Sequence, residues 1–315
     1  MKVAIIDMGT NTFHLLLAEV NEDSHEIIHR ERKAVKVGEK GINNGKITPE
    51  AWDRALKALG EFKHTIEDAG ITQIYATATS AIRSAANGEA LTIEIEKQTG
   101  IKTQIISGTR EAELILHGVK CALDLGDKKH LIMDIGGGSI EFIIADQKET
   151  YWLKSFEIGG QRLVEMFHKS DPIKMEEMME LANYFEKELK ELHDAMNTFN
   201  PQILVGCSGT FDTLSDIFCE GMGMTKDEDA TEHPLPTKGF EIIFKELITK
   251  DRETRLTIPG MIEMRVDMIV VACILVDYLL HSFNLKSIRI SAYALKEGVL
   301  MHTLDKLRET SNTSN

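Results

Sequence analysis

One short pattern occurs twice in this chain and constrains what it can fold into. Residues 2–17 read as an apolar run, an aspartate, a glycine turn and a second apolar run, and residues 131–144 repeat this layout. Without gaps, the two copies align Asp7 with Asp134, Gly9 with Gly136, Thr12 with Ser139, and His14 with Glu141. A repeated strand–turn–strand unit predicts a duplicated domain with a ligand-binding cleft between the copies.

Three consecutive glycines in the second copy indicate a phosphate-binding turn. Because Gly136, Gly137 and Gly138 lack a Cβ, the turn can reach positive φ, and its backbone N–H groups can close around an anion. Asp134 precedes the turn and Glu141 follows it, and a carboxylate beside a phosphate suggests a bound divalent cation. A hairpin with a flexible glycine loop is the alternative for one copy alone, and the second copy favours the phosphate loop.

Composition limits the classes of function. A length of 315 residues allows two domains of ordinary size. The net charge of −14 argues against general binding to nucleic acid or an anionic membrane, although it still allows a polyanionic substrate. The four cysteines lack metal-ligand spacing and are typical of reduced thiols. Asp7 interrupts the opening apolar run, so we expect no signal peptide and a cytoplasmic protein.

The order of predicted elements indicates an α/β protein with two domains. Strands and helices alternate up to residue 125, so we expect an N-terminal domain over 1–125 and a second domain over 126–297. A C-terminal helix is expected at about 298–309, and it can pack back on the first domain. Residues 309–315 are expected to form a disordered tail. Within the second domain we predict one long helix over 174–196 and another over 259–280. A further strand runs into a glycine turn at 203–210.

With these elements in place, the chain resembles the exopolyphosphatase / guanosine pentaphosphate phosphatase (Ppx/GppA) family, within the superfamily of sugar kinases, Hsp70 and actin. Six blocks carry the resemblance and occur in the family's order: Ile6–Thr12, Thr79–Arg83, Ile106–Ala112, Asp134–Glu141, Gly206–Thr210 and Ala292–Gly298. The resemblance implies two actin-like, ribonuclease H-like domains around a central cleft. It also implies release of terminal phosphate from inorganic polyphosphate or guanosine pentaphosphate, assisted by Mg²⁺ or Mn²⁺.

The same resemblance assigns roles to individual residues. By position, Glu111 matches the general base for the attacking water, and Asp134 and Glu141 match carboxylates that hold the metal or order that water. We expect Asp7, Asp134 and Glu141 at the metal. The expected phosphate-binding residues are Asn11, Thr12, Arg83, Gly136, Gly137, Gly138, Ser139, Ser208, Gly209 and Thr210. Taken alone, Arg83 reads as a solvated surface arginine, and Glu111 and Glu113 read as carboxylates that favour a helix start.

The chain departs from the family pattern at a few positions. Arg110 replaces the first of two acidic residues, but Glu111 remains, and Met8 and Ile140 look neutral for the chemistry. Longer members of the family carry a further helical domain that is not part of this sequence. We therefore expect short polyphosphates or a nucleotide to be used at least as well as long polyphosphate chains.

Other functions are weighed against this one. No Gly-Lys-Ser/Thr follows the glycines, which argues against a P-loop NTPase, and the glycine turn leads into a strand, which argues against a dinucleotide fingerprint. An ATP-dependent small-molecule kinase and a non-catalytic alarmone (ppGpp) sensor are the rivals. Expected partners are the substrate alone, with no nucleic acid and no membrane, and a homodimer is left open.

Overall fold

The computed structural model describes residues 1–315 apart from 22–23, 228 and 313–315, and the chain divides into two compact units. Unit 1 consists of Met1–Gly118 and helix α12 (Leu295–Asn312), and unit 2 is Val119–Ala294. The chain leaves unit 1 within helix α4 (Gly108–Ala122), before the position 125 predicted from sequence. Helix α12 continues past residue 309, where a disordered tail is predicted, and residues 313–315 lie outside the described part of the chain.

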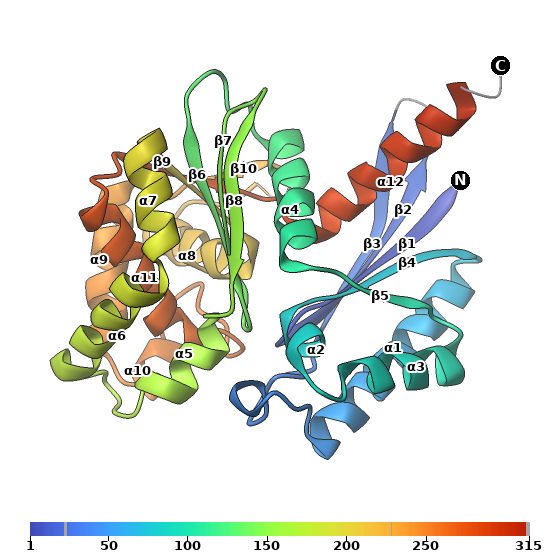
Figure 1. The fold of residues 1–315 in the computed structure, drawn as a ribbon, viewed down its shortest axis with the longest axis horizontal. Helices are drawn as coiled ribbons and strands as arrows, with labels where there is room; N and C mark the ends of the chain where they lie inside the picture. The colour runs from blue at the N-terminus through green and yellow to red at the C-terminus, as the bar shows by residue number, and fades with distance from the viewer. Residues whose placement is uncertain (22–23, 228, 313–315) are drawn as a thin grey trace. The chain divides into compact units, whose positions relative to one another are not determined.

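Unit 1 is built on a five-stranded sheet in the order β3-β2-β1-β4-β5 (Figure 1). Its strands are β1 (Lys2–Met8), β2 (Thr12–Val20), β3 (His25–Ala34), β4 (Gln73–Ala78) and β5 (Thr103–Ile105). The first three strands form an antiparallel meander, and β4 and β5 join parallel to β1. Such parallel strands need crossover connections, and helices provide them here.

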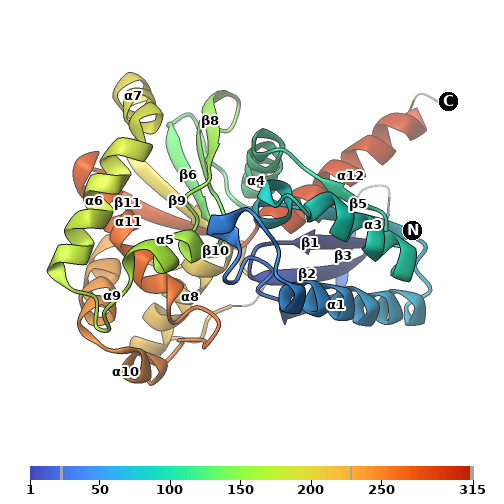
Figure 2. The same ribbon diagram turned by 60° about the horizontal axis from the view of Figure 1, so that its bottom comes forward.

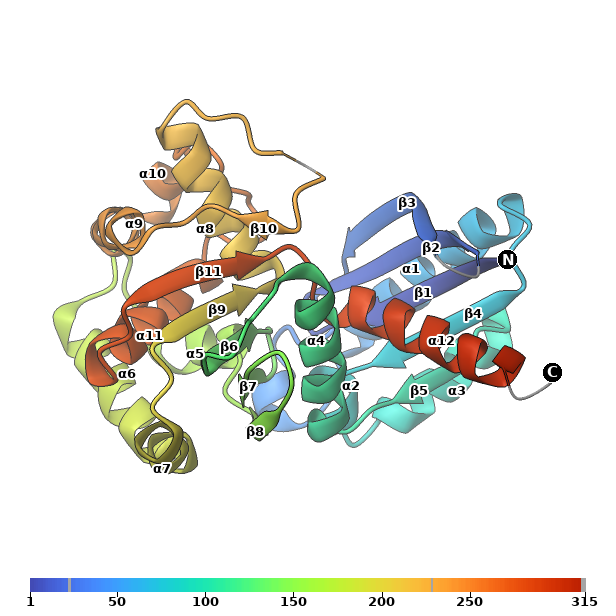
Figure 3. The ribbon, with the colours of Figure 1, turned by 90° about the horizontal axis from the view of Figure 1, so that it is seen from above.

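Helices cover both faces of the unit 1 sheet. Helices α1 (Pro49–Asp68), α2 (Ser80–Ser84) and α3 (Gly88–Thr99) connect the strands, with a 3₁₀ turn at Ile42–Asn44 before α1. Thr48 caps α1 by accepting the Ala51 N–H, and Pro49 fills the first turn, where its missing N–H costs nothing. Helix α12 packs on β1 and β2, and Figures 1 and 3 show it on the face opposite α1.

Unit 2 repeats the strand order of unit 1, which confirms the predicted duplication of an α/β unit. Its six-stranded sheet has the order β10-β11-β9-β6-β7-β8. Its strands are β6 (His130–Ile135), β7 (Ile140–Ala145), β8 (Thr150–Phe156), β9 (Ile203–Cys207), β10 (Glu232–His233) and β11 (Ser287–Ser291). Counted from β8, an antiparallel meander is again followed by two parallel strands, and β10 is added antiparallel at the far edge.

The helices of unit 2 supply most of its core. They are α5 (Gly160–Phe167), α6 (Met175–Glu188), α7 (Lys190–Phe199), α8 (Ser208–Gly221), α9 (Thr237–Thr249), α10 (Arg252–Leu256) and α11 (Met268–Ser282). The apolar run in α11 is buried on every side, where α5, α6 and α9 pack around it. None of the helices in the described part of the chain is both long and apolar enough to cross a membrane.

Two helix predictions in unit 2 are wrong. The single helix expected over 174–196 breaks at Leu189, whose ψ of 20° leaves the α-helical range. The break allows α6 to pack on α11 while α7 follows β7. The helix expected over 259–280 begins only at Met268. Gly260 cannot belong to it, because this glycine adopts a φ of +84° and lies against the backbone of Asp216.

Candidate functional site

The two predicted hairpin turns have the same backbone geometry. The Gly9 N–H donates to the carbonyl oxygen of Thr12 at 3.1 Å, and the Gly136 N–H donates to that of Ser139 at 3.1 Å. Strand pairing places Asp7 opposite His14 in the first hairpin and Asp134 opposite Glu141 in the second. The ungapped alignment of the two copies is therefore confirmed, down to the residues that flank each turn.

In the glycine turn of unit 2, the carbonyl groups are hydrogen-bonded and, in the part of the chain that the structure describes, the N–H groups that follow them are not. The carbonyl groups of Gly136, Gly137 and Gly138 accept hydrogen bonds of 2.9, 2.8 and 3.1 Å from the backbone N–H groups of Gly160, Gln161 and Gly159. By contrast, the N–H groups of Gly137, Gly138 and Ser139 donate to no acceptor within the described residues. Buried backbone donors are almost always paired, so three adjacent ones form a nest suited to an anion.

Asp134 is fixed by a residue that the sequence assigned to phosphate binding. The Ser208 Oγ donates to Oδ2 of Asp134 at 2.6 Å. Parallel pairing of β6 with β9 sets Cys207 beside Asp134, so the next residue reaches the carboxylate. Ser208 has a φ of +68°, a conformation that costs energy in any residue other than glycine, at the point where β9 turns into α8.

Glu141 is fixed in a similar way. The Ser155 Oγ on the neighbouring strand β8 donates to Oε1 of Glu141 at 2.6 Å, and Glu141 is almost fully buried. Asp134 and Glu141 face each other across the β6–β7 pair. Directly opposed residues of antiparallel strands have Cβ atoms about 4.5–5.5 Å apart. Two buried carboxylates, each with one oxygen held by a serine hydroxyl, therefore flank the glycine turn.

These two carboxylates fit the requirements of Mg²⁺, and Asp7, the third ligand expected from the sequence, stays a prediction. Mg²⁺ in phosphate-handling sites is held by one or two carboxylates together with substrate phosphates and water. Within the described ranges, no three His, Cys, Asp or Glu side chains are placed to hold a metal ion by themselves. Asp7 belongs to unit 1, whereas Asp134 and Glu141 belong to unit 2. Asp134 and Glu141, which face each other beside the glycine turn, fit a cation shared between two carboxylates and a phosphate.

In unit 1, Glu111 and Arg83 form a buried ion pair. Nη1 of Arg83 lies 2.7 Å from Oε2 of Glu111 and also donates to the Ile106 carbonyl at 3.2 Å. The two side chains are 17% and 8% exposed, so Arg83 is not the solvated surface arginine that it resembles when read alone. Glu113 differs, because its side chain is 47% exposed and pairs with Arg110 on the surface.

The remaining predicted residues of unit 1 surround the first turn. Asn11 and Thr12 are both buried, although each is polar. The turn is tied to the end of β4, where the Thr79 N–H donates to the Met8 carbonyl at 3.3 Å and the Thr77 Oγ1 donates to the Ile6 carbonyl. Asn11 and Thr12 therefore lie at the same edge of the unit 1 sheet as the start of α2, which carries Arg83.

The structure also identifies one arginine that the sequence reading missed. A Cβ built at Gly209 would lie 2.2 Å from Nη2 of Arg265, so this guanidinium group rests on the glycine at the start of α8. Thr210 follows in the same first turn and is buried. The available signal was Pro259-Gly260, a dipeptide that marks a turn. Read as a helix start, it concealed the irregular segment that carries Arg265.

Comparisons with known proteins agree with this geometry. A sequence model of the Ppx/GppA phosphatase family matches residues 16–307. Exopolyphosphatase 1 of Mycobacterium leprae is 25% identical over 307 residues, covering 97% of this chain and 90% of the relative. A guanosine-5'-triphosphate,3'-diphosphate pyrophosphatase of Pseudoalteromonas translucida is 27% identical, covering 98% of this chain and 60% of that protein. The crystal structure of an exopolyphosphatase from Cytophaga hutchinsonii is 43% identical and superposes with a TM-score of 0.95, covering 97% of this chain and 98% of that one.

Proposed function

Because the chain belongs to the Ppx/GppA phosphatase family, we propose that it is a hydrolase that releases terminal phosphate from inorganic polyphosphate or guanosine pentaphosphate. The observation that carries the proposal is the glycine turn of unit 2, with three adjacent N–H donors beside two buried carboxylates. Such a turn suits a phosphate group and a cation together. The names of the similar proteins include both activities, exopolyphosphatase and guanosine-5'-triphosphate,3'-diphosphate pyrophosphatase.

In this proposal Glu111 takes the proton from the attacking water. Phosphoryl transfer to water needs positioning and charge neutralisation more than covalent chemistry, and a base to orient the nucleophile. The hydrogen bond from Arg83 orients the Glu111 carboxylate, and a carboxylate oriented in this way can accept a proton from water. Water attacks the terminal phosphorus, the bond to the bridging oxygen breaks, and the proton passes to Glu111.

Backbone N–H groups and arginine side chains would neutralise the negative charge of the phosphate. The donors of Gly137, Gly138 and Ser139 would bind phosphoryl oxygens, and Arg265 beside Gly209 adds a positive charge at the third turn. Asp134 and Glu141 would hold Mg²⁺ or Mn²⁺. When bound, such an ion neutralises phosphate charge and polarises the phosphoryl oxygens.

The test is phosphate release from long polyphosphate, short polyphosphate and guanosine pentaphosphate, measured side by side with Mg²⁺. We expect release from at least one of them, and its loss in excess chelator. Transfer of radiolabel from ATP to an added small molecule, without release from these substrates, would instead identify a kinase. Tight binding of guanosine tetraphosphate with no phosphate release from any substrate would identify a sensor.

A further inference from the structure

The segment Gly159–Arg162, here called the clamp, binds the carbonyl groups of the glycine turn. It leads from β8 into α5, as Figure 2 shows, and its first three N–H groups donate to the three glycine carbonyls. The fourth clamp residue adds a side chain, because Nε of Arg162 donates to the Gly138 carbonyl at 2.8 Å. Gly138 therefore accepts two hydrogen bonds from the clamp.

The clamp is packed too closely against the turn to be an incidental neighbour. A Cβ at Gly159 would lie 2.4 Å from the Gly137 carbonyl carbon and from the Gly138 nitrogen, so only glycine fits there. The Arg162 side chain is 13% exposed and also contacts Oε2 of Glu157 through Nη2 at 3.1 Å. This contact restricts the guanidinium group further.

The first hairpin is held by an equivalent arrangement. The Lys36 N–H donates to the Asn11 carbonyl at 2.9 Å, and the Gly38 N–H donates to the Thr10 carbonyl at 3.1 Å. In the alignment of the two copies, Asn11 corresponds to Gly138 and Thr10 to Gly137, the residues bound by Gly159 and Gln161. In both units, the chain after the third strand of the meander returns to bind the carbonyls of the turn.

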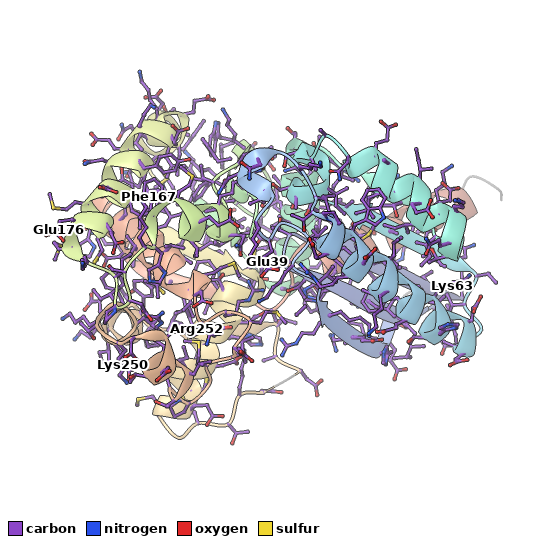
Figure 4. All side chains as sticks on the ribbon, turned by 90° about the horizontal axis from the view of Figure 1, so that it is seen from below. Glu39, Lys63, Phe167, Glu176, Lys250 and Arg252 are labelled. Atoms are coloured by element: carbon purple, nitrogen blue, oxygen red, sulfur yellow. The ribbon has the colours of Figure 1, made fainter. Side chains whose placement is uncertain are left out.

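An arginine braces this first segment as well. Nε of Arg54, on α1, donates to the Val35 carbonyl at 2.7 Å, and its Nη2 donates to the Lys36 carbonyl at 2.9 Å. The same Nη2 lies 3.1 Å from Oε2 of Glu39, which is labelled in Figure 4. The arrangement therefore recurs with a different backbone, a helix start in unit 2 and an irregular loop in unit 1.

We propose that Arg162 is a positioning residue that sets the affinity of the glycine turn for phosphate. In a peptide unit the C=O and N–H point in opposite directions, so a clamp on the carbonyl side directs the N–H groups to the other side. Three glycines without such support would lose much conformational freedom when they closed on an anion. The clamp removes that freedom before binding, which strengthens binding. This inference rests on the proposed function for the identity of the anion.

The test compares Arg162→Gln and Arg162→Lys with Arg289→Gln as the matched control. Arg289 forms a bidentate pair with Glu232 in the same unit but does not contact the turn. With inorganic tripolyphosphate as the probe, we expect Arg162→Gln to raise the Kd measured by calorimetry, and KM where the substrate is cleaved, about tenfold. The change in kcat should stay within about threefold, because a loss of uniform binding acts on KM. Arg162→Lys should recover part of the loss, since an ammonium group can still donate to the Gly138 carbonyl.

Hydrogen exchange of the amides of residues 159–161 gives a reading that does not need activity. These amides should be protected in the wild-type protein and in Arg289→Gln, and should exchange faster in Arg162→Gln. An unchanged Kd and unchanged protection in a folded Arg162→Gln protein would overturn the inference. If the wild-type protein cleaves none of the substrates, the proposed function fails, while exchange and tripolyphosphate binding still decide the clamp.

Discussion

Replacing Glu111 by glutamine tests the proposed base directly. Glutamine keeps the shape of the side chain and a carbonyl oxygen that can accept from Arg83 at the position now 2.7 Å away. It removes the negative charge and the ability to take a proton from water. Loss of a general base typically lowers the rate about 10²–10⁴-fold. Because the phosphate-binding donors lie on other residues, KM should change little.

The same change has a cost in stability that can be estimated from the ion pair. Breaking a buried pair by removing one charge costs about 3–5 kcal/mol when the other charge is left without compensation. Here Arg83 is 17% exposed, keeps its hydrogen bond to the Ile106 carbonyl and gains an amide acceptor from glutamine. We therefore expect a loss of about 1–3 kcal/mol in the free energy of unfolding. Urea unfolding would measure it, and the protein should remain folded at assay temperature.

Glu113→Gln is the matched control for Glu111→Gln, two positions along the same helix. Its pair with Arg110 lies on the surface, where such pairs contribute about 0–1 kcal/mol. Phosphate release, KM and unfolding should then be close to wild type. The reasoning is refuted if Glu111→Gln turns over at near the wild-type rate, or if Glu113→Gln is the inactive variant.

Three further changes probe other parts of the structure. Ser208→Ala and Ser208→Gly both remove the hydroxyl that holds Asp134, so both should lower phosphate release. Ser208→Gly should unfold at a higher urea concentration than Ser208→Ala, because glycine relieves a left-handed conformation that costs about 1–2 kcal/mol. Equal stabilities of the two variants would contradict the strain at this position. Asp134→Asn should weaken activity and its dependence on added Mg²⁺ together, and a variant with unaltered metal titration would remove Asp134 from the metal site. The Tyr151 hydroxyl and the N–H groups of Glu149 and Lys148 lower the pKa of Asp146 from 3.8 to about 2. This depressed pKa stabilises the fold above pH 4, and the stabilisation is lost as the pH falls towards 2. Unfolding measured across that range should depend less on pH in Asp146→Asn than in wild type, and parallel curves would contradict this.

Local patterns in the sequence were sufficient for the features that depend on neighbours along the chain. The two hairpins follow from alternation and a glycine turn, and the start of α1 follows from Thr48 and Pro49. The features that were missed depend on contacts between distant segments. Ser208 reaches Asp134 because β6 and β9 pair in parallel, and Arg265 lies against Gly209 from a segment far along the chain. The contact of Gly159 with the glycine turn is likewise one between distant segments, and no local pattern in the sequence marks it.

The two units share a fold but differ in the side chains that the proposed chemistry needs. Each unit has the same strand order, the same turn and a segment that binds the carbonyls of that turn. The side chains differ, because Asp7 faces His14 in unit 1 where Asp134 faces Glu141 in unit 2. A histidine opposite an aspartate does not offer the pair of hard oxygen ligands that Mg²⁺ prefers. The buried pair of Glu111 and Arg83, in turn, follows β5 of unit 1. The proposal therefore assigns the cation to the second copy and proton transfer to the first.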